Sequence, residues 1–325
     1  MKQHPCFFSI VSTEKKPWTN LNFGGGTDNN DFNFAIVGDR AGRPLQGVFE
    51  DAIQKLNQLN PDFVMSVGDF IPGGCMEDMS EEFFRQQWAH FENILKNCEP
   101  PFFRVPGNHD ICEEPIPQFP DVVKITKKLW LEQFGVDYYY FIFKDVLFIC
   151  LNSMVGTHKI GKEQLTWALD TLQQHKDVRW TMIFMHNPQA WLTENFAILE
   201  KELYFRNYTV FAGDIHQYTR YRRQGRNYYM LGLTGSASQR PVVPPRGVPF
   251  GEFQQLAWVS FKNDIPKVTI LALDNIYYDD VVTIPKLTWL TPRYFHGDKK
   301  ITPEEADLLE SKGLHIYRDI DKYQL

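Results

Sequence analysis

Five short apolar runs in this chain each lead into side chains that bind metal ions, and this series constrains the fold most. The side chains after the runs are Asp39, Asp69, Asn108 to Asp110, His186, and Asp214 with His216. A lone Gly-Asp after a strand is usually a turn, but that explanation would have to hold for all five runs together. In open α/β sheets, ligands gather beyond the carboxyl ends of the strands. Five such loops at one edge would bring three aspartates, one asparagine and two or three histidines together.

The spacing of apolar residues predicts an α/β chain. Helical spacing covers 45–59 and 81–97, and short buried strands lie on either side of each stretch. Strands separated by amphipathic helices favour at least partly parallel pairing. Lys144 and Asp145 join two strand-like runs as a hairpin. Further elements are a helix over 162–174 and strands over 180–185, 208–212, 228–233, 258–262 and 267–273.

Length and charge narrow the class of protein. A chain of 325 residues suits one large domain or two. The net charge of −6 gives no general attraction to nucleic acid or to anionic lipid. We expect no membrane span, since no apolar run approaches about 18 residues. Residues 6–11 are too short for a signal-peptide centre, so the chain reads as soluble and cytoplasmic, although a secreted chain without its signal would look the same.

The five cysteines form no CxxC pair and read as buried thiols.

Changes in the residue pattern along the chain predict three segments. Residues 1–30 are expected to be irregular, 31–283 to form one domain, and 284–325 to be a partly helical extension. In the extension, Thr302 and Glu305 have the spacing of a capping box. The proline-rich stretch 236–254 is expected to be a long surface loop.

The series resembles the calcineurin-like metallophosphoesterase superfamily. Its pattern is D-x-H, G-D, G-N-H-[DE], a lone His, and G-H-x-H. The counterparts here are Asp39, Gly68-Asp69, Gly107 to Asp110, His186, and Gly213 to His216. The resemblance covers about residues 32–273, and a softer similarity points to the single-domain, phosphoprotein-phosphatase-like branch. It implies a four-layer α/β/β/α sandwich, two mixed sheets flanked by helices, and a metal-dependent phosphoric ester hydrolase, either a phosphatase or a phosphodiesterase.

The resemblance also implies roles for single residues. Asp69 would bridge two divalent ions, and Asp39 and His216 would complete the first. Asn108, His186 and Asp214 would complete the second. A bridging hydroxide would attack phosphorus in line, and His109 would act at the leaving oxygen as the catalytic general acid or as a stabiliser of its charge. The substrate would be a phosphorylated small molecule or a phosphoprotein.

Two positions depart from the family pattern. Ala41 stands where the pattern has the histidine of D-x-H, and Asp214 stands where it has the first histidine of G-H-x-H. Exchanging nitrogen for oxygen ligands favours manganese or iron(II), with magnesium or zinc as alternatives. The first ion would keep three protein ligands.

Several alternatives stay open at this level. Arg40 either reaches a substrate phosphate or pairs with a neighbouring acid. The arginines between 220 and 226 either form a solvated hairpin or attract a phosphorylated partner. The main rival function is a non-catalytic metal- or phosphate-binding protein on the same fold, which Ala41 supports. A serine hydrolase is disfavoured, because the chain has no G-x-S-x-G.

Overall fold

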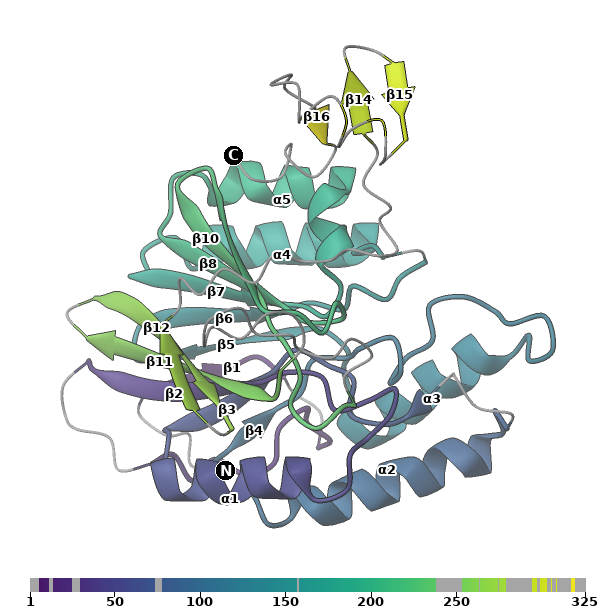
Figure 1. Ribbon diagram of the computed structural model, residues 1–325. Coiled ribbons are helices and arrows are strands. Elements are labelled where there is room, and N and C mark those ends of the chain that lie inside the picture. The colour runs from purple at the N-terminus through teal and green to yellow at the C-terminus, as the bar shows by residue number, and fades with distance from the viewer. Residues whose placement is uncertain are drawn as a thin grey trace.

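The protein is seen in a computed structural model as two stacked β-sheets with helices on both outer faces (Figure 1). The structure describes residues 6–11, 14–24, 30–73, 78–156, 158–237, 253–262, 264–273, 275–278, 294–296, 299–302, 305, 308 and 317–318. This arrangement confirms the predicted four-layer α/β/β/α sandwich.

One sheet has six strands in the order β13-β12-β11-β2-β3-β4. Their bounds are β2 Phe32–Val37, β3 Phe63–Ser66, β4 Phe102–Phe103, β11 Gln255–Lys262, β12 Ile265–Ala272 and β13 Asn275–Tyr278. β2, β3 and β4 run parallel, and β11 joins β2 antiparallel. The parallel strands carry the first three of the five sequence runs, so the polar residues that follow them leave from one sheet edge.

The other sheet has seven strands in the order β1-β5-β6-β7-β8-β10-β9. Their bounds are β1 Phe7–Ser9, β5 Tyr139–Phe143, β6 Val146–Cys150, β7 Trp180–Phe184, β8 Tyr208–Ala212, β9 Thr219–Arg223 and β10 Arg226–Met230. β6, β7, β8 and β10 run parallel. The predicted hairpin is confirmed, with left-handed backbone at Lys144 (φ 44°) and Asp145 (φ 61°), as a two-residue turn with both φ positive requires.

Helices cover each sheet on its outer face (Figure 1). α1 (Val48–Leu59), α2 (Glu81–Leu95) and α3 (Val122–Phe134) pack on the six-stranded sheet. α4 (Lys162–Gln174), the 3-10 helix η2 (Pro188–Leu192) and α5 (Glu194–Leu203) pack on the seven-stranded sheet. The expected helices over 45–59, 81–97 and 162–174 are therefore present, whereas α3 and α5 were not expected.

Stacked phenylalanines fill the space between the two sheets. The rings of Phe34 and Phe63 are parallel within 8°, with their centroids 5.1 Å apart. The rings of Phe141 and Phe148 are parallel within 1°, with their centroids 4.6 Å apart. All four rings are fully buried. Burying rings of this size dominates core energetics, and offset or edge contacts add about 0.5–1.5 kcal/mol per pair. This dry aromatic layer holds the two sheets, and therefore their loop-bearing edges, against each other.

The chain termini depart from the expected pattern. Phe7–Ser9 pairs with β5 and is a sheet edge strand, because its alternating exposure lets Phe7 pack into the inter-sheet core. β14 (Tyr294–His296), β15 (Lys299–Ile301) and β16 (Tyr317–Arg318) form a small sheet in the segment that was expected to be partly helical. The Thr302–Glu305 capping box is confirmed in both directions.

Two sequence expectations fall partly outside the described residues. Most of the proline-rich stretch 236–254 lies there, and so does the boundary at 283/284, which stays a prediction. Of the cysteines within the described part, Cys98, Cys112 and Cys150 are buried free thiols and Cys6 is half-buried.

Candidate metal centre

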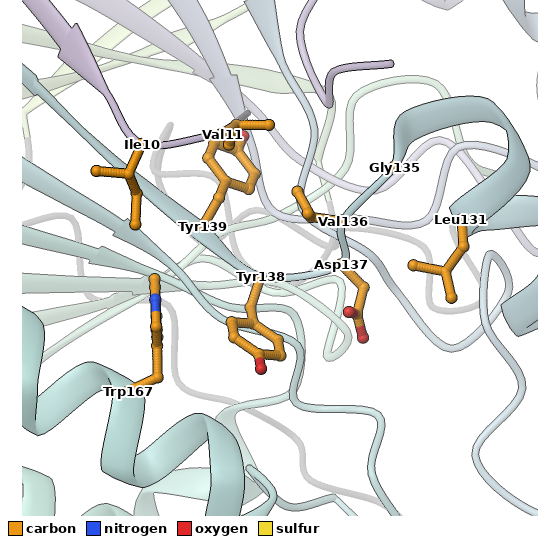
Figure 2. A pocket seen from close by; sticks show the side chains of 9 residues that line it. All are labelled: Ile10, Val11, Leu131, Gly135, Val136, Asp137, Tyr138, Tyr139 and Trp167. Carbon is orange, nitrogen blue, oxygen red and sulfur yellow. The ribbon is translucent and has the colours of Figure 1, made fainter. Parts of the chain in front are cut away.

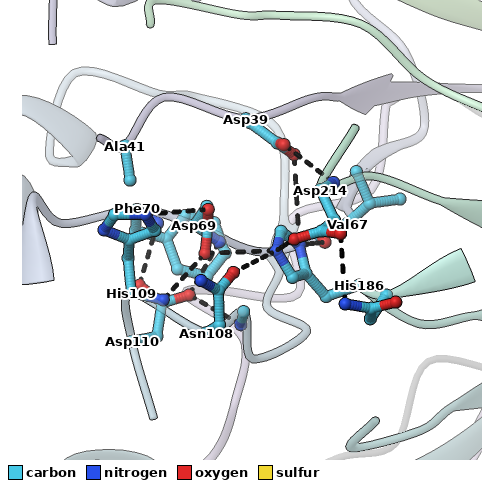
Figure 3. Close-up of polar contacts among 12 residues, drawn as sticks. Asp39, Ala41, Val67, Asp69, Phe70, Asn108, His109, Asp110, His186 and Asp214 are labelled. Atoms are coloured by element: carbon cyan, nitrogen blue, oxygen red, sulfur yellow. Dashed lines mark hydrogen bonds and ion pairs between the residues drawn. The ribbon is translucent and has the colours of Figure 1, made fainter. Parts of the chain in front are cut away.

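The loops after β2, β3, β4, β7 and β8 meet at one end of the sandwich, and Figure 3 shows side chains from them pointing toward one another. All six predicted metal ligands and His109 lie on these five loops. The sheet edges impose this meeting, because both groups of parallel strands end on the same side.

Glycines let the loops approach closely. A Cβ on Gly107 would lie 2.2 Å from the Asp69 Oδ1 atom, and a Cβ on Gly213 would lie 2.4 Å from the Asp39 Oδ1 atom. Real Cβ atoms do not approach neighbours so closely, so any side chain there would push the loops apart. Gly107 and Gly213 therefore make room for the carboxylates of the neighbouring loops.

Asp39, Asp69 and His216 form the first group of candidate ligands. One ligand atom from each lies within 4.8 Å of the other two. The His216 Nε2 atom is 3.3 Å from Asp39 Oδ2, and Asp39 Oδ1 is fully buried with no hydrogen-bond partner. A buried, unpaired carboxylate oxygen is costly, and a cation would satisfy it. These residues fit a divalent ion.

The second group surrounds the imidazole of His186. A carbonyl oxygen can only accept, so His186 Nδ1 donates to Val67 O at 2.7 Å and Nε2 faces the group. Three oxygens surround Nε2: Asn108 Oδ1 at 2.8 Å, Asp69 Oδ1 at 3.3 Å and Asp214 Oδ1 at 3.5 Å. Ligands about 2.1 Å from one octahedral ion lie about 3 Å apart. These spacings fit a second divalent ion.

Asp110 fixes the backbone beneath both groups. Its fully buried carboxylate accepts the backbone N–H groups of Asp69, Phe70, Ile71 and Gly107 at 2.8 to 3.3 Å. This contact set makes Asp110 a cap of the loop backbone. Because the bonds join the loops after β3 and β4, the cap also sets the distance between them.

His109 stands at the open side of the site and is partly exposed. Its Nδ1 donates to the Pro72 carbonyl oxygen, and its backbone N–H donates to Asp69 Oδ1 at 3.0 Å. The Nε2 atom lies 3.9 Å from Asp69 Oδ2. Since Nδ1 is engaged, Nε2 is the nitrogen directed at the group around Asp69, and it is the atom that would meet a leaving oxygen.

Crowding of carboxylates controls the charge of the site. Burial raises the pKa of Asp39 well above its ordinary value; His186 opposes this shift, and Asp69 and Asp214 add to it. Burial, with the charge of Asp69, raises the pKa of Asp110 to about 7. Burial alone would lower the pKa of His186, but Asp69, Asp214 and Asp39 raise it well above the ordinary value. Without metal, protons offset the negative charge that a cation would neutralise.

The placement of Arg40 argues against the predicted substrate contact. Its side chain is 5% exposed, Nη1 donates to Phe70 O at 2.6 Å, and the guanidinium stacks on Phe49 and Phe91. The group is directed into the helix-covered core, because aromatic rings and a carbonyl there offset the cost of burial. The carbonyl of Phe70 takes the place of the acidic partner that the sequence also allowed.

Ala41, the first departure from the family pattern, is fully buried. Its N–H donates to Asp69 O at 2.8 Å and its carbonyl accepts from Ser236 Oγ at 2.5 Å. The backbone of Ala41 thus bonds to two neighbouring loops, and the first group has the three candidate ligands that the sequence predicted.

Three neighbours of the site were missed in the sequence. Asn187 Nδ2 donates to Asp214 Oδ2 at 3.1 Å and lies 2.7 Å from His158 Nδ1, and His158 contacts Glu113. Asn187 directly follows a candidate ligand, which is a usable signal. His158 and Glu113 belong to no motif, and only the folded loops bring them here.

Two other features of the described residues, a cavity and the arginine hairpin, have charged side chains that are already paired. A cavity of about 270 Å³ beside Tyr138 and Trp167 contains none of the predicted site residues, and its Asp137 already bonds Lys127 and Asn152 (Figure 2). In the hairpin, Arg223 pairs with Glu200, which favours the structural reading of that arginine. No helix in the described part of the chain is long and apolar enough to cross a membrane.

Comparisons with known proteins bear on the fold and on the family of the chain. Comparison with curated sequences gave no significant match. Among solved structures, the fold is similar to GAP50, the anchor in the inner membrane complex of Plasmodium, with 12% identity, a TM-score of 0.50, and 78% of this chain and 87% of that one covered. A 5'-nucleotidase from Candida albicans matches with 13% identity and a TM-score of 0.45 over 79% of this chain, which spans 53% of the nucleotidase. Residues 32–218 match the calcineurin-like phosphoesterases, and the chain belongs to that family.

Proposed function

We propose that this protein is a metal-dependent phosphoric ester hydrolase whose two divalent ions are held by residues from the five loops. Asp39, Asp69 and His216 would hold one, and Asn108, His186 and Asp214, with Asp69 shared, would hold the other. The observation that carries this proposal is that Asp69 belongs to both groups of candidate ligands. Its Oδ1 lies 3.3 Å from His186 Nε2 in the second group, and its carboxylate is also part of the first group.

When bound, paired divalent ions neutralise the phosphoryl oxygens and supply a hydroxide nucleophile near neutral pH. The chain itself contributes orientation and proton transfer. His109, with Nδ1 held by Pro72, presents Nε2 to the leaving oxygen and either donates a proton or stabilises the charge there. Asp110 keeps the loop that carries His109 at a fixed distance from Asp69.

Substrate recognition would depend on the ions and on His109, since Arg40 is directed into the core. We expect a phosphorylated small molecule or a phosphoprotein. Manganese or iron(II) suits the oxygen-rich ligand set, with magnesium or zinc as alternatives.

The test combines elemental analysis with two chromogenic esters. Purified protein would be assayed with p-nitrophenyl phosphate and bis-p-nitrophenyl phosphate after addition of manganese, iron(II), magnesium or zinc. We expect bound metal and metal-dependent turnover, with the favoured ester separating phosphatase from phosphodiesterase. Absence of both metal and turnover under every addition would contradict the proposal.

A second candidate is a non-catalytic metal- or phosphate-binding protein. Ala41 favours it, because the first group lacks the imidazole of the family pattern and has three protein ligands. Calorimetry and the ester assays together separate the two candidates. Tight manganese binding without turnover of either ester would support the binding protein.

A further inference from the structure

Asn187 has a fixed orientation beside the second group. It is fully buried between His186 and the start of η2. Its N–H donates to Ser153 Oγ at 2.9 Å, and its Oδ1 caps η2 by accepting the Gln189 N–H at 2.8 Å. Because the oxygen is engaged by a backbone donor, the NH₂ group must be on the opposite side of the amide. The assignment of amide oxygen and nitrogen therefore follows from the cap.

The NH₂ group then makes two contacts. It donates to Asp214 Oδ2 at 3.1 Å, and its nitrogen lies 2.7 Å from His158 Nδ1. His158 is held in turn by Glu113, whose Oε2 accepts the His158 backbone N–H at 3.3 Å and whose Oε1 lies 3.0 Å from the same Nδ1 atom. His158 has a left-handed backbone (φ 55°), which is uncommon for a residue with a side chain. A continuous row of contacts thus runs from Glu113 to Asp214.

This row determines how Asp214 is presented. The backbone of Asp214 is left-handed (φ 68°), and its N–H donates to Asp39 Oδ2 at 2.8 Å. With Oδ2 engaged by Asn187, Oδ1 is the oxygen that faces His186 Nε2. A carboxylate is shorter than an imidazole, so it reaches the same place only from a fixed backbone and in a fixed rotamer.

We propose that Asn187, braced by His158 and Glu113, is a positioning residue that orients Asp214 as an oxygen ligand where the family pattern has an imidazole. This inference rests on the proposed function, since it takes the second group to bind a divalent ion. The three residues would then be the local compensation for the second departure from the pattern, and would favour manganese at this site over softer, nitrogen-preferring ions.

The test is a calorimetric titration with manganese of the wild type and of Asn187→Ser. Serine also caps helices well, so the variant keeps an oxygen acceptor for the η2 cap and removes the amide donor to Asp214. Loss of such an outer contact typically weakens metal binding about 10–100-fold. We expect that loss at one of two sites, with the other unchanged. His158→Ala, in a partly exposed loop, should give a smaller loss at the same site, and the double variant should lose less than the two single losses combined.

Asn195→Ser is the matched control. Asn195 donates to Ile160 O at 2.8 Å and contacts no candidate ligand, so the same chemical change there should leave both affinities unchanged. Wild-type affinity in Asn187→Ser, or equal weakening in Asn187→Ser and Asn195→Ser, would overturn the positioning role and leave the proposed function intact. No manganese binding by the wild type would overturn both.

Discussion

The two halves of the candidate metal centre, one on each sheet, are held by different means. On the six-stranded sheet, the loops after β3 and β4 are joined through backbone N–H groups that all bind one buried carboxylate, Asp110. On the seven-stranded sheet, the loops after β7 and β8 are joined through side chains, with Asn187 bonded to Asp214. A backbone network depends on one side chain only, whereas a side-chain network depends on every member.

This difference matches the way each half keeps the family pattern. The loops after β3 and β4 retain G-D and G-N-H-D in full, and there the structure needs no further support. The loop after β8 carries the Asp214 departure, and there the row of Asn187, His158 and Glu113 is found. The side-chain network is therefore found around the loop in which Asp214 departs from the family pattern.

The largest effect is expected at Asp69, because its carboxylate belongs to both groups of candidate ligands. Asp69→Asn keeps an oxygen for the His109 N–H but removes the charge shared by both groups. We expect ester turnover to fall to background and manganese binding to weaken at both sites. The metal-free variant should be at least as stable as the wild type, since a repelling buried charge is gone. Loss of binding at one site only would show that the halves are independent.

Asp110 tests the backbone-held half alone. Asp110→Ala would leave four buried N–H groups without their acceptor, and each unsatisfied group costs about 1–3 kcal/mol. We expect the free energy of unfolding, measured with urea, to fall by at least about 3 kcal/mol. Asp110→Asn keeps an acceptor oxygen and should lose less. Equal, small losses in both variants would contradict the capping role.

Metal removal tests the charge balance common to both halves. Asp39, Asp110 and His186 all have raised pKa values in the folded, metal-free protein. From about pH 4 to above pH 7 the native state therefore binds more protons than the unfolded state, and stability falls as the pH rises. After treatment with a chelator, we expect a lower melting temperature at pH 7.5 than at pH 5.5. Manganese should restore it at pH 7.5; a melting temperature that rises with pH would contradict this account.

The sequence predicted the site residues that belong to motifs, on both sheets, and missed those that only packing brings to the site. Asp39, Asp69 and His216 could be named because each follows a strand at a recognisable spacing, and the strands impose their meeting. His158 and Glu113 lie 45 residues apart without a motif, and only the folded loops bring them together. Helix α3 was also missed, although its buried residues Val122, Thr126, Leu129, Trp130 and Phe134 recur at helical spacing.

The smallest expected effect concerns Arg40, where sequence and structure disagree. Arg40→Met keeps an apolar stem against Phe49 and Phe91 and removes the donor to the Phe70 carbonyl. We expect a loss of about 1–3 kcal/mol in the free energy of unfolding, with KM for p-nitrophenyl phosphate within about twofold of wild type. A guanidinium that bound substrate phosphate would behave differently, because losing a charge-assisted hydrogen bond of about 1.5–3 kcal/mol raises KM about tenfold or more. Such a rise in KM without loss of stability would return Arg40 to the substrate site. It would also mean that the loop after β2 changes conformation when substrate binds.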